Sequence, residues 1–138
     1  DLCWRIKNSG HKIICVPLSV IYHVGGGSLP QGTPRKTYLN FRNNLMMMFK
    51  NMKAGEVIWK IFIVRLLMDG IAAFYSVIKN KNFADLTAIL KAHFSFYDSI
   101  LNLIEKRKGI AHPSSVHLTP VNVVWQYFIK GKKKYREL

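Results

Sequence analysis

A long apolar run in the middle of the chain, Val57 to Ile78, limits the folds that this sequence can adopt more than any other feature. It reads VIWKIFIVRLLMDGIAAFYSVI and has about the 20-residue length of a transmembrane helix. Its interior carries Lys60, Arg65 and Asp69, and a charge costs about 2.5–3.5 kcal/mol at the bilayer centre. Arg65 and Asp69 stand four residues apart, so they can pair on one helix face and lower this cost.

The small and polar residues of this region recur at steps of four and three, which places them on one stripe of a helix. They are Arg65, Asp69, Ala72, Ser76 and Lys79. Such a stripe is typical of a helix that lies in a membrane interface or packs against neighbouring helices. We therefore expect a long helix over Glu56–Lys79 that lies on a membrane or in a bundle rather than across a bilayer.

Amphipathic helices are predicted on both sides of this run. In Pro34–Met52, apolar residues alternate at steps of three and four, and proline suits the first position of a helix. The helix that follows the run extends to about Arg107 and ends at Gly109. His93 falls on the apolar stripe of that helix, where we expect a hydrogen-bonded packing histidine rather than a ligand.

The charge of the chain is strongly positive. It contains 21 Lys and Arg residues against 7 Asp and Glu residues, a formal net charge of +14 among 138 residues. Such a balance predicts an anionic partner. Because neither an RNA-recognition pattern nor a zinc-finger spacing is present, anionic lipid and sugar diphosphate are favoured and no nucleic-acid partner is expected.

The opening of the chain, Asp1 to Asn44, carries a different pattern. Its first residues predict a short amphipathic helix that ends at Gly10. Lys12–Val16 and Ser19–Val24 are rich in β-branched residues and predict strands. His23 then lies at the end of a predicted strand, just before a run of three glycines, which is where α/β proteins bind ligands.

Three segments of this opening are DLCWRIKNSGHKI, SVIYHVGGGS and PRKTYLNFRNN. They resemble the C-terminal part of the catalytic domain in bacterial family-2 glycosyltransferases of the rhamnosyltransferase-like kind. The resemblance implies an α/β N-terminus, the end of a GT-A catalytic domain over residues 1–53, followed by a mainly α-helical, membrane-associating appendage over residues 54–138. It also implies transfer of a sugar from a nucleotide-sugar donor to a lipid-linked glycan or polysaccharide acceptor, on the inner, cytoplasmic face of the cytoplasmic membrane.

The resemblance also assigns roles to residues. In that family an acidic pair precedes DLCWR, so the general base would lie two residues before Asp1, and Asp1 would support the acceptor side. The histidine that ends the following strand holds Mn²⁺ or Mg²⁺ in metal-dependent relatives, which matches His23; without the family, His23 only ends a strand. Donor diphosphate contacts would come from the glycine loop and the next helix, at Gly25, Gly26, Gly27, Ser28, Arg35, Lys36 and Arg42.

Two alternatives remain open for these residues. The basic side chains of 35–42 equally suit a solvated helix face, and three glycines without a following P-loop lysine indicate little alone. The acidic residues are scattered and form no Asp-x-Asp motif. We therefore expect a fragment that is inactive alone, because the nucleotide-binding half and the base are absent.

The last residues, KGKKKYREL, are basic and lie close to Trp125, Tyr127 and Phe128. Basic side chains near anionic lipid contribute about 1 kcal/mol each, so this tail predicts a membrane-surface contact. A frayed soluble tail is the alternative. The predicted contact residues are Lys132, Lys133, Lys134 and Arg136. An alternative function for the whole chain is a non-catalytic basic helical module that binds an anionic membrane surface.

Overall fold

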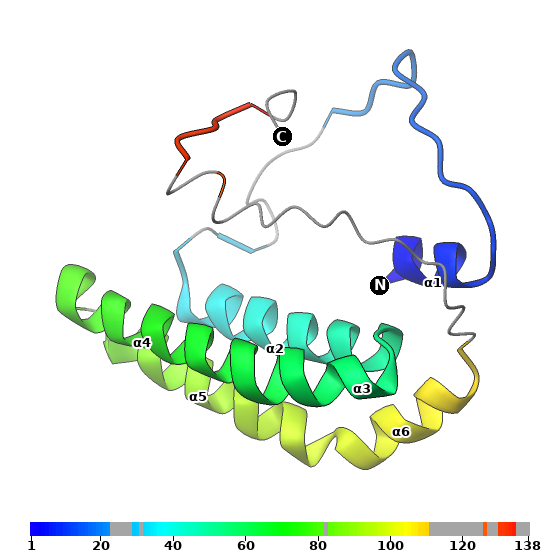
Figure 1. The fold of residues 1–138 in the computed structure, drawn as a ribbon. Coiled ribbons are helices and arrows are strands. Elements are labelled where there is room, and N and C mark those ends of the chain that lie inside the picture. Colours follow the sequence, from blue (N-terminus) through cyan, green and yellow to red (C-terminus); the bar gives the residue numbers. More distant parts are fainter. Residues whose placement is uncertain (23–28, 31, 82, 111–125, 127–129, 135–138) are drawn as a thin grey trace.

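The computed structural model describes residues 1–22, 29–30, 32–81, 83–110, 126 and 130–134 (Figure 1). The described residues form six α-helices and one π-helix, and no strand occurs among them. The elements are α1 (Leu2–Asn8), α2 (Pro34–Asn51), α3 (Ala54–Val57), the π-helix η1 (Ile58–Arg65), α4 (Leu66–Asn80), α5 (Phe83–Asp98) and α6 (Ile100–Lys108).

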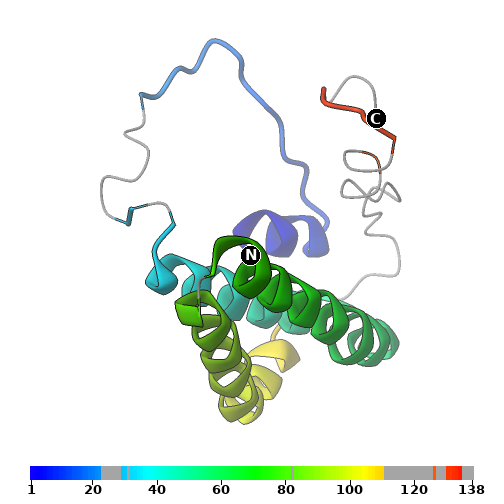
Figure 2. The same ribbon diagram turned by 90° about the vertical axis from the view of Figure 1, so that its left-hand side faces the viewer.

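The predicted α/β start of the chain, the end of a GT-A domain, is wrong for the described residues. The segment 11–22 forms no strand and arches away from the helices (Figures 1 and 2). Its apolar side chains are exposed, with Leu18 at 94% and Tyr22 at 97%. A β-branched composition stabilises a strand only through packing against cross-strand neighbours. No described segment offers such a neighbour here, and only the helical part of the predicted fold class is correct.

The first predicted helix is confirmed as α1. After it, Gly10 adopts a left-handed φ of +81°, and its N–H donates to the carbonyl oxygen of Lys7 at 3.0 Å. A left-handed residue after the last turn is a common helix terminator that glycine adopts at low cost. The buried side chain of Asn8 donates from Nδ2 to the carbonyl oxygen of Asn51 at 3.5 Å. This contact places α1 against the C-terminal end of α2.

Helix α2 is an ordinary amphipathic helix, as its periodicity predicts. The hydroxyl oxygen of Thr33 caps it by accepting from the backbone N–H of Lys36 at 3.4 Å. Leu45 and Phe49 face inward and are 0% and 8% exposed. Phe49 packs edge-on against Phe96 of α5, with ring centroids 5.8 Å apart. The apolar side of α2 therefore forms the centre of the core.

Helices α3, η1 and α4 form one continuous helical segment, which confirms the predicted long helix (Figure 1). The π-helical stretch was not predicted. Ala54–Ile78 spans 25 residues and is long and apolar enough to cross a membrane, yet only 22% of its most apolar window is buried. A core helix of a water-soluble protein is mostly buried, so this segment differs from one.

The last predicted helix is divided into α5 and α6 by a bend at Ser99. The Ser99 hydroxyl donates to the carbonyl oxygen of Ser95 at 2.8 Å, a local bond that often bends helices. The bend allows α6 to reach α2, where the guanidinium of Arg107 donates to the carbonyl oxygens of Phe49 and Met52. Arg107 thus caps the C-terminus of α2. The predicted division of the chain near residue 53 stays a prediction.

Candidate functional site

Helix α4, the second half of the long helix, turns polar side chains toward the other helices and large apolar side chains outward. Asp69 and Ser76 are 2% and 8% exposed, whereas Leu67 and Phe74 are 64% and 68% exposed. In water-soluble proteins an amphipathic helix has the opposite orientation. We call the exposed side the apolar outer face; it comprises Ile58, Trp59, Ile63, Val64, Leu66, Leu67, Met68, Ile71, Phe74, Tyr75 and Ile78.

The neighbouring helix extends this apolar surface. Helix α5 packs beside α4, and Phe83, Leu90 and Phe94 of α5 are 66%, 49% and 72% exposed. Large exposed apolar patches mark contacts with membranes or other proteins. The outer sides of α4 and α5 together therefore form one exposed apolar surface.

Three charged or titratable side chains meet on the inward side of α4. Asp69 lies at the centre, with its Oδ1 2.8 Å from Nη2 of Arg65 and its Oδ2 3.1 Å from Nε2 of His93. Buried carboxylates require such partners, because an unpaired charge is strongly destabilising. This Arg65–Asp69–His93 triad confirms the predicted pairing of Arg65 with Asp69 on one helix face and the predicted hydrogen bonding of His93. The connection between the two was not predicted.

Hydrogen bonds outside the triad also join the inward sides of the helices. The carboxylate of Asp85 accepts from the Thr37 hydroxyl at 2.9 Å and from the Ser76 hydroxyl at 3.3 Å. The phenol of Tyr38 donates to the Ser95 hydroxyl at 3.1 Å. Helices α2, α4 and α5 are therefore held together by polar contacts as well as by the core.

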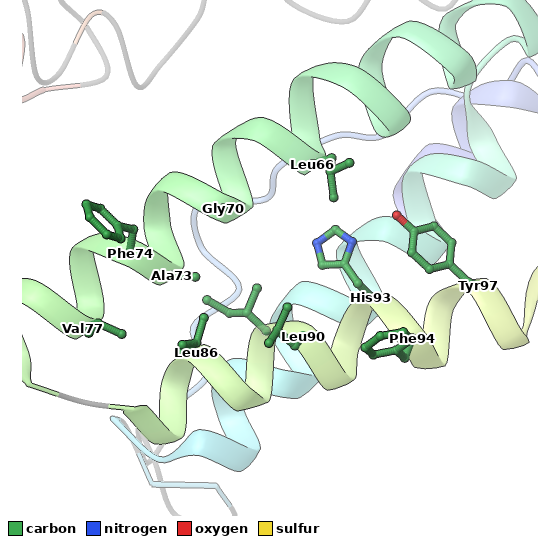
Figure 3. Close-up of a pocket in the computed structure, with 11 residues that line it drawn as sticks. Leu66, Gly70, Ala73, Phe74, Val77, Leu86, Leu90, His93, Phe94 and Tyr97 are labelled. Atoms are coloured by element: carbon green, nitrogen blue, oxygen red, sulfur yellow. The ribbon is translucent and has the colours of Figure 1, made fainter.

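A groove with a volume of about 430 Å³ lies between α4 and α5, next to the triad (Figure 3). Figure 3 shows His93 and Tyr97 at one end of the groove and Val77 at the other. Burial, together with the charge of Asp69, raises the pKa of Tyr97. The volume is within the range of about 300–1,000 Å³ found for ligand pockets. The lining residues are Leu66, Gly70, Ala73, Phe74, Val77, Leu86, Ile89, Leu90, His93, Phe94 and Tyr97.

One nitrogen of the His93 side chain lacks a partner. Nδ1 of His93 is buried and has no hydrogen-bond partner among the described residues. Most buried polar atoms in folded proteins are hydrogen-bonded, so an unsatisfied one needs an explanation. The lining of the groove itself is apolar except for His93 and Tyr97.

The predicted diphosphate residue Arg42 is engaged inside the protein. Its Nη1 donates to the Tyr38 phenol at 3.2 Å, and its Nε and Nη2 lie 3.1 Å and 3.0 Å from Oδ1 of Asn43. Hydrogen bonds with Ser95 and Arg42 lower the pKa of the Tyr38 phenol. The Arg42 guanidinium also lies over the Tyr38 ring, 5.1 Å from its centroid. Arg42 is therefore engaged by partners on its own helix, and it is linked to α5 only through the bond of Tyr38 with Ser95.

The other predicted basic residues of α2 are placed differently. Arg35 is exposed and lines a hollow of about 250 Å³ together with Lys91 of α5, while Lys36 is half-buried. The sequence did not indicate Lys91, because its proximity to Arg35 depends on how α2 and α5 pack. Arg35 and Lys91 are thus the basic pair that the structure brings to one surface.

Asp1 attaches α1 to the end of α2. Its Oδ1 accepts from Nδ2 of Asn51 at 2.9 Å, and its Oδ2 lies 3.0 Å from Nζ of Lys50 and 3.1 Å from Nε of Arg5. These bonds join the first of the resembling segments to the C-terminal end of α2, beyond the resembling segment 34–44. The carboxylate is fixed at both oxygens.

Several predicted site residues fall outside the described part of the chain. They are His23, Gly25, Gly26, Gly27, Ser28 and Arg136. Lys132, Lys133 and Lys134 are described and form no helix. Among the described residues, no group of three or more His, Cys, Asp or Glu side chains is arranged to hold a metal ion.

Comparison of the chain with models of protein families, with curated proteins and with solved structures finds no match. The resemblance to family-2 glycosyltransferases therefore stays a prediction.

Proposed function

We propose that this chain is a helical module that binds an anionic membrane surface. The observation that supports the proposal is the reversed orientation of α4, which has a polar side in the bundle and an exposed apolar outer side. Burying one large apolar side chain contributes about 1.5–3 kcal/mol, so insertion of only a few residues of this face gives firm binding. A position in the membrane interface also leaves Arg65 and Asp69 paired inside the protein.

The charge of the chain supports an anionic surface in particular. The net charge is +14, and basic side chains near anionic lipid contribute about 1 kcal/mol each. Arg5, Lys7 and Arg35 are exposed on α1 and α2, and Lys133 and Lys134 are exposed near the end of the chain. Apolar insertion and electrostatic attraction together form the two signals that stable peripheral binding needs.

Replacement of Leu67 by Glu tests this proposal. Leu67 is 64% exposed on the apolar outer face, so Leu67→Glu removes an inserted side chain without disturbing the core. We expect partition into vesicles of mixed neutral and anionic phospholipid to fall about tenfold or more, because tenfold corresponds to about 1.4 kcal/mol. Vesicle co-sedimentation measures the partition, and circular dichroism checks that the helix content is unchanged.

The matched control is Asn40→Glu, which adds the same charge at an exposed position of α2. General repulsion between the added carboxylate and anionic lipid would weaken both variants equally. Equal partition of Leu67→Glu and Asn40→Glu would therefore contradict insertion of the apolar outer face.

Sugar transfer is a second candidate function, and the bonds of Asp1 favour it. They fix the carboxylate that begins the first resembling segment, next to the position that the family gives to the general base. A catalytic residue two positions before Asp1 would then lie next to a residue that is firmly held against α2. In such an enzyme, the described helices would bind the membrane and so keep the acceptor-binding side of the active site close to the lipid-linked acceptor.

Reading the source locus upstream of the Asp1 codon tests this second function. We expect an acidic residue two positions earlier and an Asp-x-Asp motif further upstream, and a start codon directly before Asp1 would exclude the function. Mn²⁺ or Mg²⁺ is expected by resemblance, but the only proposed ligand in this chain is His23. A single imidazole does not make a site for these ions, which prefer several oxygen ligands, so no metal step is derived for this chain.

A further inference from the structure

We propose that a basic hollow between α2 and α5 binds a phosphate monoester group, supplied by the headgroup of a membrane lipid. The hollow has a volume of about 250 Å³, and its charged lining residues are Arg35 of α2 and Lys91 of α5. No acidic residue is among its described lining residues. This inference depends on the proposed function, because a lipid headgroup reaches the hollow only when the chain lies on a membrane.

Both cations of the hollow are available to a ligand. Arg35 and Lys91 are exposed, and neither has a hydrogen-bond or ion-pair partner for its side chain within the described part of the chain. Arg42, on the same helix as Arg35, is instead bonded to Tyr38 and Asn43. The chain therefore engages Arg42 internally but leaves two cations unpaired beside one hollow.

The N-terminal end of α2 adds to the positive field of the hollow. Pro34 begins α2 and lines the hollow, and the first turn of the helix contains no acidic residue. The partial positive charge of the helix N-terminus is therefore not compensated within this turn. The backbone N–H of Arg35 also has no acceptor among the described residues. Free N–H groups at a helix N-terminus favour an anionic ligand.

The two side-chain charges favour a doubly charged phosphate. A phosphate monoester carries a charge of about −1.5 to −2 at pH 7. The phosphodiester of an ordinary phospholipid carries a single charge and offers fewer terminal oxygens. The guanidinium of Arg35 suits two phosphate oxygens at once, and the ammonium of Lys91 acts as a compact point charge. A monoester therefore matches both cations, whereas a diester matches one.

The hollow lies at the border of the exposed apolar surface. Lys91 stands three residues before Phe94 of α5, whose ring is 72% exposed. Thr87, which also lines the hollow, stands three residues before Leu90 and four after Phe83. Residues three or four apart are neighbours on a helix surface. When the apolar side chains enter a membrane, the hollow therefore lies at its polar boundary, where lipid phosphates are found.

Vesicle co-sedimentation of the full chain tests the headgroup preference. One set of vesicles contains phosphatidic acid, and the other contains phosphatidylglycerol at the fraction that gives the same zeta potential. We expect the wild type to bind the phosphatidic acid vesicles about tenfold more tightly, a factor that one additional hydrogen bond to a charged group supplies. Equal binding to the two sets would mean that only total charge matters and would overturn the inference.

A double variant, Arg35→Gln with Lys91→Gln, tests the hollow itself. The matched control is Lys12→Gln with Lys106→Gln, which removes two charges at exposed positions that do not line the hollow. We expect the hollow variant to lose the preference for phosphatidic acid and the control to keep it. Loss in both variants, or in neither, would reject the hollow. Circular dichroism checks that the helix content of both is unchanged.

Soluble glycerol 3-phosphate distinguishes a lipid source from a free one. We expect the wild type to keep its preference for phosphatidic acid vesicles when glycerol 3-phosphate is present in excess, because membrane attachment raises the effective concentration of the lipid phosphate at the hollow. Loss of the preference would mean that the soluble ester displaces the lipid, and it would reject the lipid source.

These measurements also separate the inference from the proposed function. Equal binding to both sets of vesicles would leave membrane binding intact and overturn the inference alone. A chain that binds neither set would overturn the proposed function. In that case the ³¹P resonance of glycerol 3-phosphate, measured with the chain in non-ionic detergent micelles, tests the hollow alone. A shift that the hollow variant abolishes would retain the phosphate monoester site, and an unchanged resonance would overturn it as well.

Discussion

Helices α2 and α4 both pack against α5, but α2 turns its apolar side toward the bundle and α4 turns its polar side toward it. In α2 the buried side chains are apolar, as Leu45 and Phe49 illustrate, whereas α4 buries Asp69 and Ser76 and exposes leucines and aromatics. In both helices the narrower stripe faces the bundle: the apolar stripe in the mainly polar α2, and the polar stripe in the mainly apolar α4. Under the proposed function, the outer side of α4 contacts the apolar part of a membrane, whereas the outer side of α2 stays in polar surroundings.

The strongest test of this comparison is Asp69→Ala in the polar stripe of α4. Removing one partner of a buried ion pair costs about 3–5 kcal/mol, because the remaining charge is left uncompensated. Here the variant leaves Arg65 without its 2.8 Å contact and His93 without its 3.1 Å contact. We expect a loss of this size in the free energy of unfolding, measured by urea titration in detergent micelles.

Asp98→Ala is the matched control for that substitution, since Asp98 is an exposed carboxylate on α5. Surface substitutions usually change stability by less than about 0.5 kcal/mol. Equal stability of the two variants would mean that the inward side of α4 is solvated and that the helix is not reversed.

A pair of leucine truncations tests both helices at once. Leu45 of α2 is 0% exposed, and we expect Leu45→Ala to lower the free energy of unfolding by about 2–5 kcal/mol. Leu67 of α4 is 64% exposed, and Leu67→Ala should change it by less than about 0.5 kcal/mol in the same micelles. A larger loss for Leu67→Ala would show that the outer face of α4 packs against protein.

The sequence predicted the helices well because helices depend mainly on local patterns. The alternating steps of Pro34–Met52 and the cap at Gly10 need no distant partner to be recognised. The strands predicted from residue 12 to 16 and from residue 19 onward are absent in the described part of the chain for the opposite reason, since a strand is stabilised by a neighbour that local composition does not supply. The bend at Ser99 was missed although its cause is local, because the bond of the Ser99 hydroxyl to Ser95 lies within an apolar pattern that continues on both sides.

The candidate site was only partly predictable. Helical spacing predicted the pairing of Arg65 with Asp69, and the apolar stripe of α5 predicted a packed His93. That Asp69 joins these two residues could not be read from the sequence, because the contact spans 24 residues and depends on how α4 packs against α5. The buried set also differs in detail from the predicted stripe: Ala73 is buried and Ala72 is exposed. The π-helical turns of η1 take more residues than α-helical turns and shift the register between the two ends of the long helix.

The substitution with the smallest expected effect, Ser76→Ala, tests where the polar stripe of α4 ends. Ser76 donates to Asp85 at 3.3 Å, and loss of one such hydrogen bond costs about 0.5–1.5 kcal/mol. We expect Ser76→Ala to fall in this range, because Asp85 keeps its 2.9 Å bond from Thr37 and no charge is left unpaired. The control Thr87→Ala removes an exposed hydroxyl that bonds only within its own helix, so it should cost nothing. Equal values for the two variants in urea titration would end the polar stripe before Ser76, and the reversal of α4 would then be confined to the turns around Asp69.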